Sequence, residues 1–301
     1  MMRCMLTAIA YALPVMTMLC FGTGLVTSQL GLRDVDPRSG ASTSVPSAAL
    51  LFITVSLFWL DTTHASWQAL ALFAVVGLFF PASVTLMNFA STEKIGASLT
   101  SIISGTSPIF SMLAAWLILQ EPLSPRAWGA SAGILCGLLL ISWRRTRAAR
   151  SDSRFSSRPW QHYLPALGSA IVRGGSLVLA KVGLLMWASP LGASLMGYIS
   201  SALVLIGLHR WRLRHQIQPS PHTRRSRLFF ITTGLLNGIG LLTMYAALQH
   251  LPVSTVAPVV AAYPVVTVML SAFVVRSEQL GWGELIGMAI TLGSVIWLVS
   301  A

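Results

Sequence analysis

The stretch Ile102–Ser142 reads IISGTSPIFSMLAAWLILQEPLSPRAWGASAGILCGLLLIS. It holds two long apolar segments separated by the short polar turn QEPLSPR. The stretch Pro258–Val299 reads PVVAAYPVVTVMLSAFVVRSEQLGWGELIGMAITLGSVIWLV and has the same layout. A hydrocarbon core about 30 Å thick takes roughly 20 apolar residues per helical span. Each stretch therefore predicts two transmembrane helices joined by a tight turn.

The two stretches also match in residues that apolar helices rarely share by chance. Pro108 pairs with Pro264 and Glu121 pairs with Glu278, and a glycine-bearing apolar segment follows each glutamate. The parts of the chain that precede the two stretches correspond as well, with only small gaps. Chance similarity between two leucine- and alanine-rich helices does not explain matching prolines, acidic residues and glycines in one order. The chain therefore contains an internal repeat.

The composition places both copies of the repeat in a membrane. Of 301 residues, 54% are hydrophobic and only 9% are charged, and the mean hydropathy is +0.73. A soluble domain carries about 25% charged residues. Apolar runs between polar breaks predict an all-α integral membrane protein with ten transmembrane helices. These spans are expected near residues 5–30, 44–60, 67–88, 97–119, 126–143, 163–187, 190–208, 228–248, 253–275 and 282–300.

Ten spans divide into two repeats of five helices, residues 1–143 and residues 163–301, joined by the basic loop 144–162. Because five is odd, the second copy enters the membrane from the opposite face, so the two five-helix repeats are inverted. Inverted repeats are a common construction of secondary transporters, whose substrate site lies near the membrane midplane between the repeats. The pattern predicts a transporter that works by alternating access.

The motifs of both copies resemble one known family. Leu117–Ser124, with the sequence LILQEPLS, resembles the end of an EamA-domain unit, and so does Val274–Leu280. Leu30–Pro37 resembles the loop after the first helix of the same unit. The resemblance covers nearly the whole chain and implies the drug/metabolite transporter superfamily. It implies that the protein moves small organic solutes across the cytoplasmic (inner) membrane as a multi-pass protein.

Departures from the family pattern limit what the resemblance implies about the substrate. EamA units often carry an arginine early in the second helix, whereas its expected start at Ser44–Ser47 has none. The first helix of an EamA unit usually has a Trp-Gly pair, where the first copy has Phe21-Gly22 and the second copy has Arg173 ahead of Gly174. Lysine is frequent near the end of that helix, where the first copy has Gln29 and the second has Lys181. The substrate of any one relative therefore does not transfer to this chain.

Charged residues inside spans are costly and usually face a cavity. Arg173 lies near the middle of its span, and Lys181 lies two turns further on. The alternatives are a structural pair for Arg173 and an interfacial anchor for Lys181. If Arg173 faces a cavity, its fixed charge favours carboxylate, phosphate or zwitterionic substrates. The acidic residues all fall in loops or at span ends, which argues against exchange of protons for cationic drugs.

Prolines and polar residues inside the spans supply the other candidates. Pro108 and Pro264 interrupt the fourth and ninth spans and are candidate hinges, the alternative being kinked helices that are simply packed. Buried polar residues are candidate substrate contacts, the alternative being hydrogen bonds that join helices. The candidate substrate-binding residues are Arg173, Lys181, Gln29, Thr106, Ser107, Tyr198, Asn237 and Tyr263.

These features favour a secondary transporter over two rivals, a non-transporting scaffold or subunit and a membrane-embedded enzyme. The histidines mostly sit in loops without catalytic spacing, the three cysteines lack metal-ligand spacing, and no P-loop is present. We therefore expect no cofactor and no metal. The expected partners are a small-molecule substrate and membrane lipid, and a homodimer is left open. The arginine-rich segment 209–227 indicates membrane orientation rather than a nucleic-acid partner.

Loop charge predicts the orientation. The loops between spans 1–2, 3–4, 5–6, 7–8 and 9–10 share one face and hold sixteen of the twenty lysines and arginines. The positive-inside rule then places the loops 144–162 and 209–227 in the cytoplasm and both termini outside. Members of the EamA family typically have cytoplasmic termini, so loop charge and family habit disagree.

Overall fold

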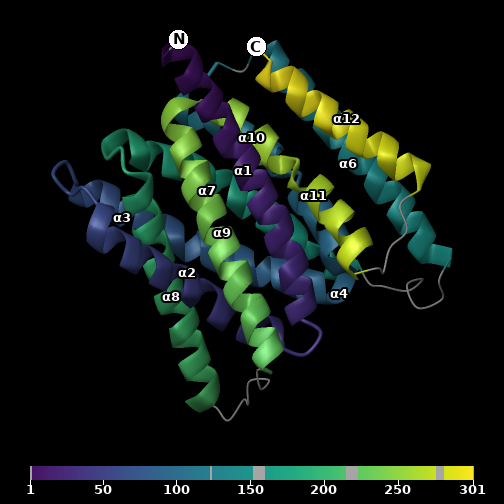
Figure 1. Cartoon of the computed structure of the whole chain (residues 1–301), viewed down its shortest axis with the longest axis horizontal. Coiled ribbons are helices and arrows are strands. Elements are labelled where there is room, and N and C mark those ends of the chain that lie inside the picture. Colours follow the sequence, from purple (N-terminus) through teal and green to yellow (C-terminus); the bar gives the residue numbers. More distant parts are fainter. Residues whose placement is uncertain (1, 123, 152–159, 215–222, 276–280, 301) are drawn as a thin grey trace.

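The computed structural model describes residues 2–122, 124–151, 160–214, 223–275 and 281–300, and all regular structure in these ranges is helical. Glu278 and the middle of the basic loop 144–162 lie outside the described residues. The first copy contains α1 (Met2–Gly31), α2 (Pro37–Trp59), α3 (Trp67–Gly77), α4 (Val84–Ser104), α5 (Ser107–Ala114) and α6 (Pro125–Ser151). The second contains α7 (Leu164–Met186), α8 (Pro190–Arg214), α9 (Arg224–His250), α10 (Val253–Ala261), α11 (Tyr263–Leu270) and α12 (Trp282–Val299). Figure 1 shows these helices as one bundle.

Within the described residues, nine helical segments are long and apolar enough to cross a membrane. The chain is therefore an all-helical, multi-pass membrane protein, as the composition predicts. One of the nine, Trp67–Leu119, is 53 residues long. At 1.5 Å per residue it would measure about 80 Å if it were straight, well over twice the thickness of a hydrocarbon core.

This long segment is not one regular helix. The π-helical turn η1 (Leu78–Ser83) joins α3 to α4, and Phe80 within it has non-helical angles (φ −134°, ψ 116°). A second break occurs inside α4 at Gly96 (φ 84°, ψ 163°), in a region of backbone space that favours glycine. The expected loop between spans 67–88 and 97–119 is therefore reduced to a break at this one residue.

The second helix begins at Pro37 rather than near residue 44. The Asp36 carboxylate accepts hydrogen bonds from the backbone N–H groups of Arg38 and Ser39 at 3.0 and 3.1 Å, and Pro37 occupies the first helical position. Both features start helices. Arg38 therefore lies in the first turn of α2, and the prediction that this helix lacks an early arginine was wrong.

The two copies interlock through equivalent contacts. In the first copy α1 packs most extensively against α9 of the second, and α4 packs in the corresponding way against α7. The contacts of α2 with α9 and of α3 with α8 form a second such pair, and those of α1 with α11 and of α5 with α7 form a third. The counterpart of α9 is the third expected span, residues 67–88, which comprises α3 and the start of α4, so exchanging the copies converts each contact into its partner. The interface between the copies is therefore approximately symmetric.

The last helices of the two copies, α6 and α12, lie side by side at one edge of the bundle (Figure 1). A Cβ atom on Gly137 would lie 2.5 Å from the Gly287 carbonyl oxygen, and one on Gly287 would lie 2.7 Å from the Gly137 oxygen. These glycines therefore allow the backbones to meet, as small residues do between membrane helices.

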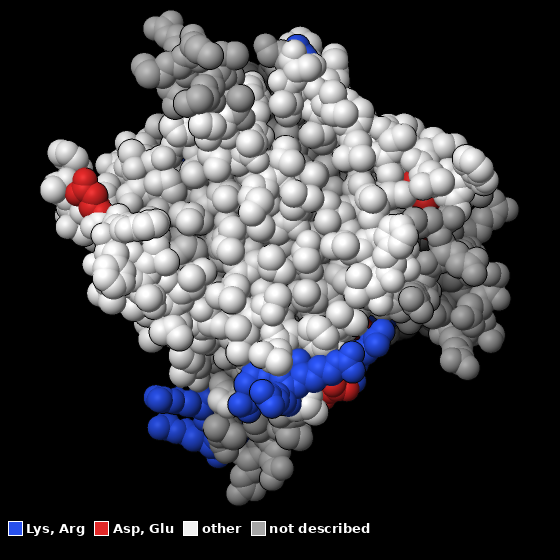
Figure 2. Space-filling view, in the orientation of Figure 1, with Lys and Arg blue, Asp and Glu red and all other residues white. Residues whose placement is uncertain are grey.

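Basic side chains gather at one end of the bundle (Figure 2). The arginines in the last turns of α8 and the first turn of α9 lie there, beside the connection from α1 to α2. The start of α1 and the end of α12 lie at the opposite end (Figure 1). In the described part of the chain, the excess of basic residues that the sequence predicts for one side of the membrane therefore lies at one end of the bundle.

Candidate functional site

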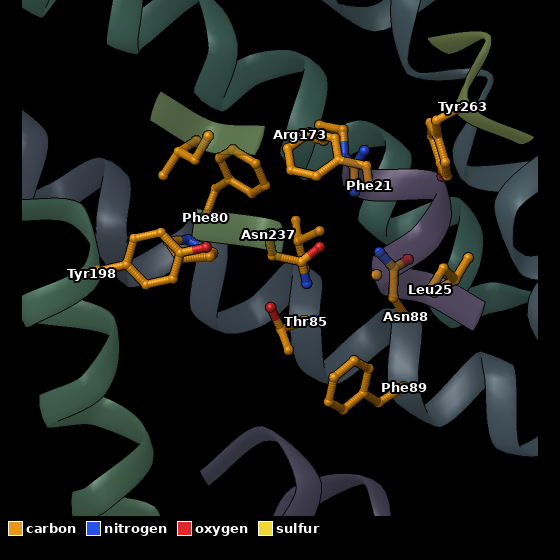
Figure 3. Close-up of a pocket in the computed structure, with 14 residues that line it drawn as sticks. Phe21, Leu25, Phe80, Thr85, Asn88, Phe89, Arg173, Tyr198, Asn237 and Tyr263 are labelled. Atoms are coloured by element: carbon orange, nitrogen blue, oxygen red, sulfur yellow. The ribbon is translucent and has the colours of Figure 1, made fainter. Parts of the chain in front are cut away.

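A cavity lies between the two copies, and helices of both contribute to its walls (Figure 3). Its empty space amounts to about 480 Å³, but the centre of a water molecule fits in only about 30 Å³ of it. A water molecule needs roughly 10–15 Å³ of such space. The cavity therefore has room for about two water molecules and must widen to admit an organic solute. The lining residues are Phe21, Gly24, Leu25, Phe80, Pro81, Val84, Thr85, Asn88, Phe89, Arg173, Tyr198, Asn237, Leu241 and Tyr263.

Arg173 of α7 is the charged residue of this cavity. Only 7% of it is exposed, and its Nε and Nη1 atoms are buried without a hydrogen-bond partner in the protein. Its guanidinium carbon lies 5.0 Å from the ring centre of Phe21, 5.2 Å from that of Tyr263 and 5.7 Å from that of Phe80. Cation–π attraction to these rings stabilises the charge in part. It does not satisfy the N–H donors of the guanidinium.

The cavity wall supplies no counter-charge to Arg173. None of the fourteen lining residues is acidic. The described acidic residues lie in connections or at helix ends and breaks, as Asp36 does at the start of α2. Within the described residues, no group of three or more histidine, cysteine, aspartate or glutamate side chains is placed to hold a metal ion. The charge on the cavity lining is therefore the positive charge of Arg173.

Two glycines let equivalent helices of the copies meet beside the cavity. A Cβ atom on Gly22 of α1 would lie 2.8 Å from the carbonyl oxygen of Tyr263 at the start of α11. A Cβ atom on Gly174 of α7 would lie 3.0 Å from the carbonyl oxygen of Ser107 at the start of α5. Each glycine directly follows one of the two corresponding cavity positions, phenylalanine in the first copy and arginine in the second. The approximate symmetry therefore extends to the cavity.

Asn88 of α4 lines the cavity, although the sequence did not single it out. Its Oδ1 atom accepts a hydrogen bond from the Ser104 hydroxyl at 3.0 Å, and that hydroxyl lies 2.7 Å from the hydroxyl of Ser169 in α7. These buried side chains join α4 to α7 and fix the position of the amide. A polar residue inside an apolar span was the available signal, the same signal that identified Asn237.

The structure brings together four of the eight predicted substrate-binding residues. Arg173, Tyr198, Asn237 and Tyr263 all line the cavity, and in Figure 3 Tyr198 reaches in from the side opposite Tyr263. The other four, Gln29, Lys181, Thr106 and Ser107, are not among the lining residues.

The two candidate hinge prolines sit directly after helix breaks. Pro108 lies in the first turn of α5, after the break between α4 and α5 at residues 105–106. Pro264 lies in the first turn of α11, after the break at Ala262. The interruptions fall where the prolines predict them. Thr106, in the first break, donates its hydroxyl to the Ile103 carbonyl oxygen at 2.8 Å.

The profile described as the EamA-like transporter family matches residues 8–143 and, a second time, residues 161–300. The chain belongs to the EamA-like transporter family. It is thus a member of the drug/metabolite transporter superfamily, with two EamA repeats. A solved structure described only as "Crystal structure of protein" matches with a TM-score of 0.75 and 14% identity, over 96% of this chain and 95% of that one. This match shows the fold alone. None of the curated proteins compared with the chain matches it.

Lys181 of this EamA-like protein contacts helix ends. Its Nζ atom donates to the carbonyl oxygens of Leu248 and Leu251, the latter at 3.3 Å. These carbonyls end α9, where positive charge is favourable. Glu121 accepts hydrogen bonds from the N–H groups of the first two residues of α10 at 3.3 and 3.4 Å. The two side chains together cap both sides of the turn between α9 and α10.

We expect Lys181→Met to destabilise the EamA-like fold without changing the charge preference of the cavity. The substitution leaves carbonyls at the end of α9 unpaired, and a hydrogen bond from a charged donor contributes about 1.5–3 kcal/mol. The measurement is the thermal unfolding midpoint of the protein in detergent, with Lys181→Arg as the control that keeps a donor. A selective rise in KM for an anionic solute at an unchanged unfolding midpoint would instead place Lys181 in the substrate path.

Proposed function

We propose that the chain is a secondary transporter that moves a small organic solute across the cytoplasmic membrane, with carboxylated or zwitterionic compounds favoured. The observation that carries the proposal is the buried guanidinium of Arg173, which faces a cavity between the copies and has no acidic partner there. A buried charge is costly unless it is paired. A carboxylate is its natural partner because it accepts two parallel hydrogen bonds from a guanidinium.

The proposal includes ten membrane crossings in two inverted units, residues 1–143 and 163–301. We propose that Trp67–Leu119 crosses twice and reverses at Gly96, which adds one crossing to the nine helical segments of the described residues. The length of this segment and the unusual backbone angles of Gly96 support the reversal. An even number of crossings also agrees with the start of α1 and the end of α12 lying at one end of the bundle (Figure 1).

We propose that the protein works by alternating access, which the small size of the cavity and its position between the copies support. A cavity with room for about two water molecules admits a metabolite only when the copies move apart on one side. Because the contacts between copies come in equivalent pairs, opening toward either face breaks a similar set of contacts. We propose that the helix breaks before Pro108 and Pro264 act as the hinges.

The orientation is also a proposal: the basic face lies in the cytoplasm and both termini lie outside. It rests on the gathering of arginines at one end of the bundle (Figure 2). A cysteine introduced at Thr223, at the start of α9, tests it in a protein whose Cys4, Cys20 and Cys136 are changed to serine, with a membrane-impermeant maleimide in intact cells. We expect labelling only after the cells are opened, and labelling of intact cells would reverse the orientation.

The function is tested by solute flux into proteoliposomes that contain the purified chain. The panel holds radiolabelled monocarboxylates, dicarboxylates, amino acids, phosphate esters and organic cations, with protein-free liposomes as the control. We expect at least one carboxylated or zwitterionic compound to enter and the organic cations to stay outside. If no compound moves, or only cations move, the proposal is wrong.

A further inference from the structure

The guanidinium of Arg173 occupies an aromatic cage. The rings of Phe21, Tyr263 and Phe80 face it at 5.0, 5.2 and 5.7 Å from the guanidinium carbon. Several aromatic faces around one point form the arrangement with which proteins recognise cationic ligands such as quaternary ammonium groups. Here the cation inside the cage belongs to the protein itself.

The rings of the cage come from three separate elements, so the cage is part of the packed interface between the copies. Phe21 lies on α1, Phe80 on η1 and Tyr263 on α11, and each is 6% exposed or less. The Phe21 ring packs against Gly240 of α9, where an added Cβ would lie 2.8 Å from the ring. Packing of this kind holds the Phe21 ring in position independently of the arginine.

We propose that Arg173 fills a cation site and thereby sets the charge selectivity of the cavity. While the guanidinium is in the cage, a second cation meets like charge in a space that contains no acidic residue. Removing the side chain leaves three aromatic faces and the space of the lost group, which a small planar cation fills. The effect of Arg173 on which charge the cavity admits rests on the proposed transport function. The cage itself rests only on the positions of Arg173 and the three rings.

The test uses Arg173→Ala, with methylguanidinium as the probe and urea as its neutral control of similar shape. We expect millimolar methylguanidinium to raise the unfolding midpoint of Arg173→Ala in detergent, at matched ionic strength, and urea to leave it unchanged. The apparent affinity of Arg173→Ala for the probe should exceed that of the wild type by about tenfold or more, because the probe gains cation–π contacts with three rings that Arg173 occupies in the wild type. Arg173→Lys, which keeps a cation in the cage, should not respond.

Arg173→Met serves as the folding control, because its apolar side chain fills the cage. If Arg173→Ala is purified only in the presence of methylguanidinium, that rescue supports the cage. If Arg173→Met folds and methylguanidinium neither binds nor rescues Arg173→Ala, the proposal is overturned. Equal responses to urea and methylguanidinium would overturn it as well.

The outcomes separate this inference from the proposed function. If the wild type transports a carboxylate but Arg173→Ala does not bind methylguanidinium, the cage proposal is wrong and the transport proposal stands. If Arg173→Ala binds methylguanidinium but the wild type transports no compound, the transport proposal is wrong and the cage proposal stands. When both hold, Arg173→Ala proteoliposomes should take up radiolabelled methylguanidinium and wild-type proteoliposomes should exclude it.

Discussion

Arg173→Ala is expected to lower the initial uptake rate of the best-transported carboxylate by about 100-fold or more at low substrate concentration. Two hydrogen bonds from the guanidinium to a carboxylate, at about 1.5–3 kcal/mol each, correspond to a factor of this size. Arg173→Lys keeps the charge but loses the paired geometry, so its rate should fall between those of the wild type and the alanine variant. The measurement is initial uptake in proteoliposomes at matched protein content.

Arg126→Ala is the matched control for this prediction. Arg126 donates to the Trp297 carbonyl oxygen and lies 5.6 Å from the centre of the Trp297 ring, at the packed pair of α6 and α12. Because it does not line the cavity, its removal should leave uptake close to the wild-type rate. Wild-type uptake by Arg173→Ala, with a normal unfolding midpoint, would show that the substrate does not pair with this arginine.

Gly174→Ala is expected to give the second large effect. The added Cβ would lie 2.6 Å from the Phe110 Cβ and 2.8 Å from the Ser111 backbone nitrogen. Neither atom is the free end of a flexible side chain, so α5 and α7 must separate. Overpacking typically costs about 1–3 kcal/mol. We expect a lower unfolding midpoint and, because α7 carries the cavity residue Arg173, a loss of transport beyond the loss of folded protein.

Gly175→Ala is the neighbouring control, because nothing lies within 4 Å of a Cβ atom built there. A helical glycine replaced by alanine in open space should be neutral or stabilise by about 0.5–1 kcal/mol. Each variant adds one methyl group to α7, and the two positions are adjacent. Differences in expression or detergent should therefore affect both variants alike. Equal midpoints for the two variants would mean that α5 and α7 do not pack as closely as described.

The sequence predicted the repeat because its evidence is carried by residues that stand out from an apolar background. Pro108 and Pro264, with the polar turns that follow them, are easy to recognise against leucine- and alanine-rich helices. The start of α2 was missed although the signal was present, since an aspartate followed by proline is a known way to begin a helix. The sequence predicts a loop where the structure has a break at Gly96, because it does not show which backbone angles a glycine adopts.

The candidate site was predicted in its polar part and missed in its apolar part. Arg173 and Asn237 stand out because a charge or an amide inside a span needs a reason. Phe80 and Phe89 do not stand out, because a phenylalanine in a cavity wall and one in a packed core look alike in sequence. Lys181 contacts carbonyls nearly seventy residues away in the chain, and only the packing of α7 against α9 reveals that contact.

The cavity itself offers the most direct test of alternating access. A cysteine replaces Thr85, which lines the cavity, in a protein whose Cys4, Cys20 and Cys136 are changed to serine. The probe is a small, impermeant, anionic methanethiosulfonate, which suits a cavity that contains Arg173. It is applied to right-side-out and to inside-out vesicles. Alternating access predicts labelling from both sides, slowed by a transported carboxylate. Labelling from one side only, or from neither, would contradict a cavity that opens to each face in turn.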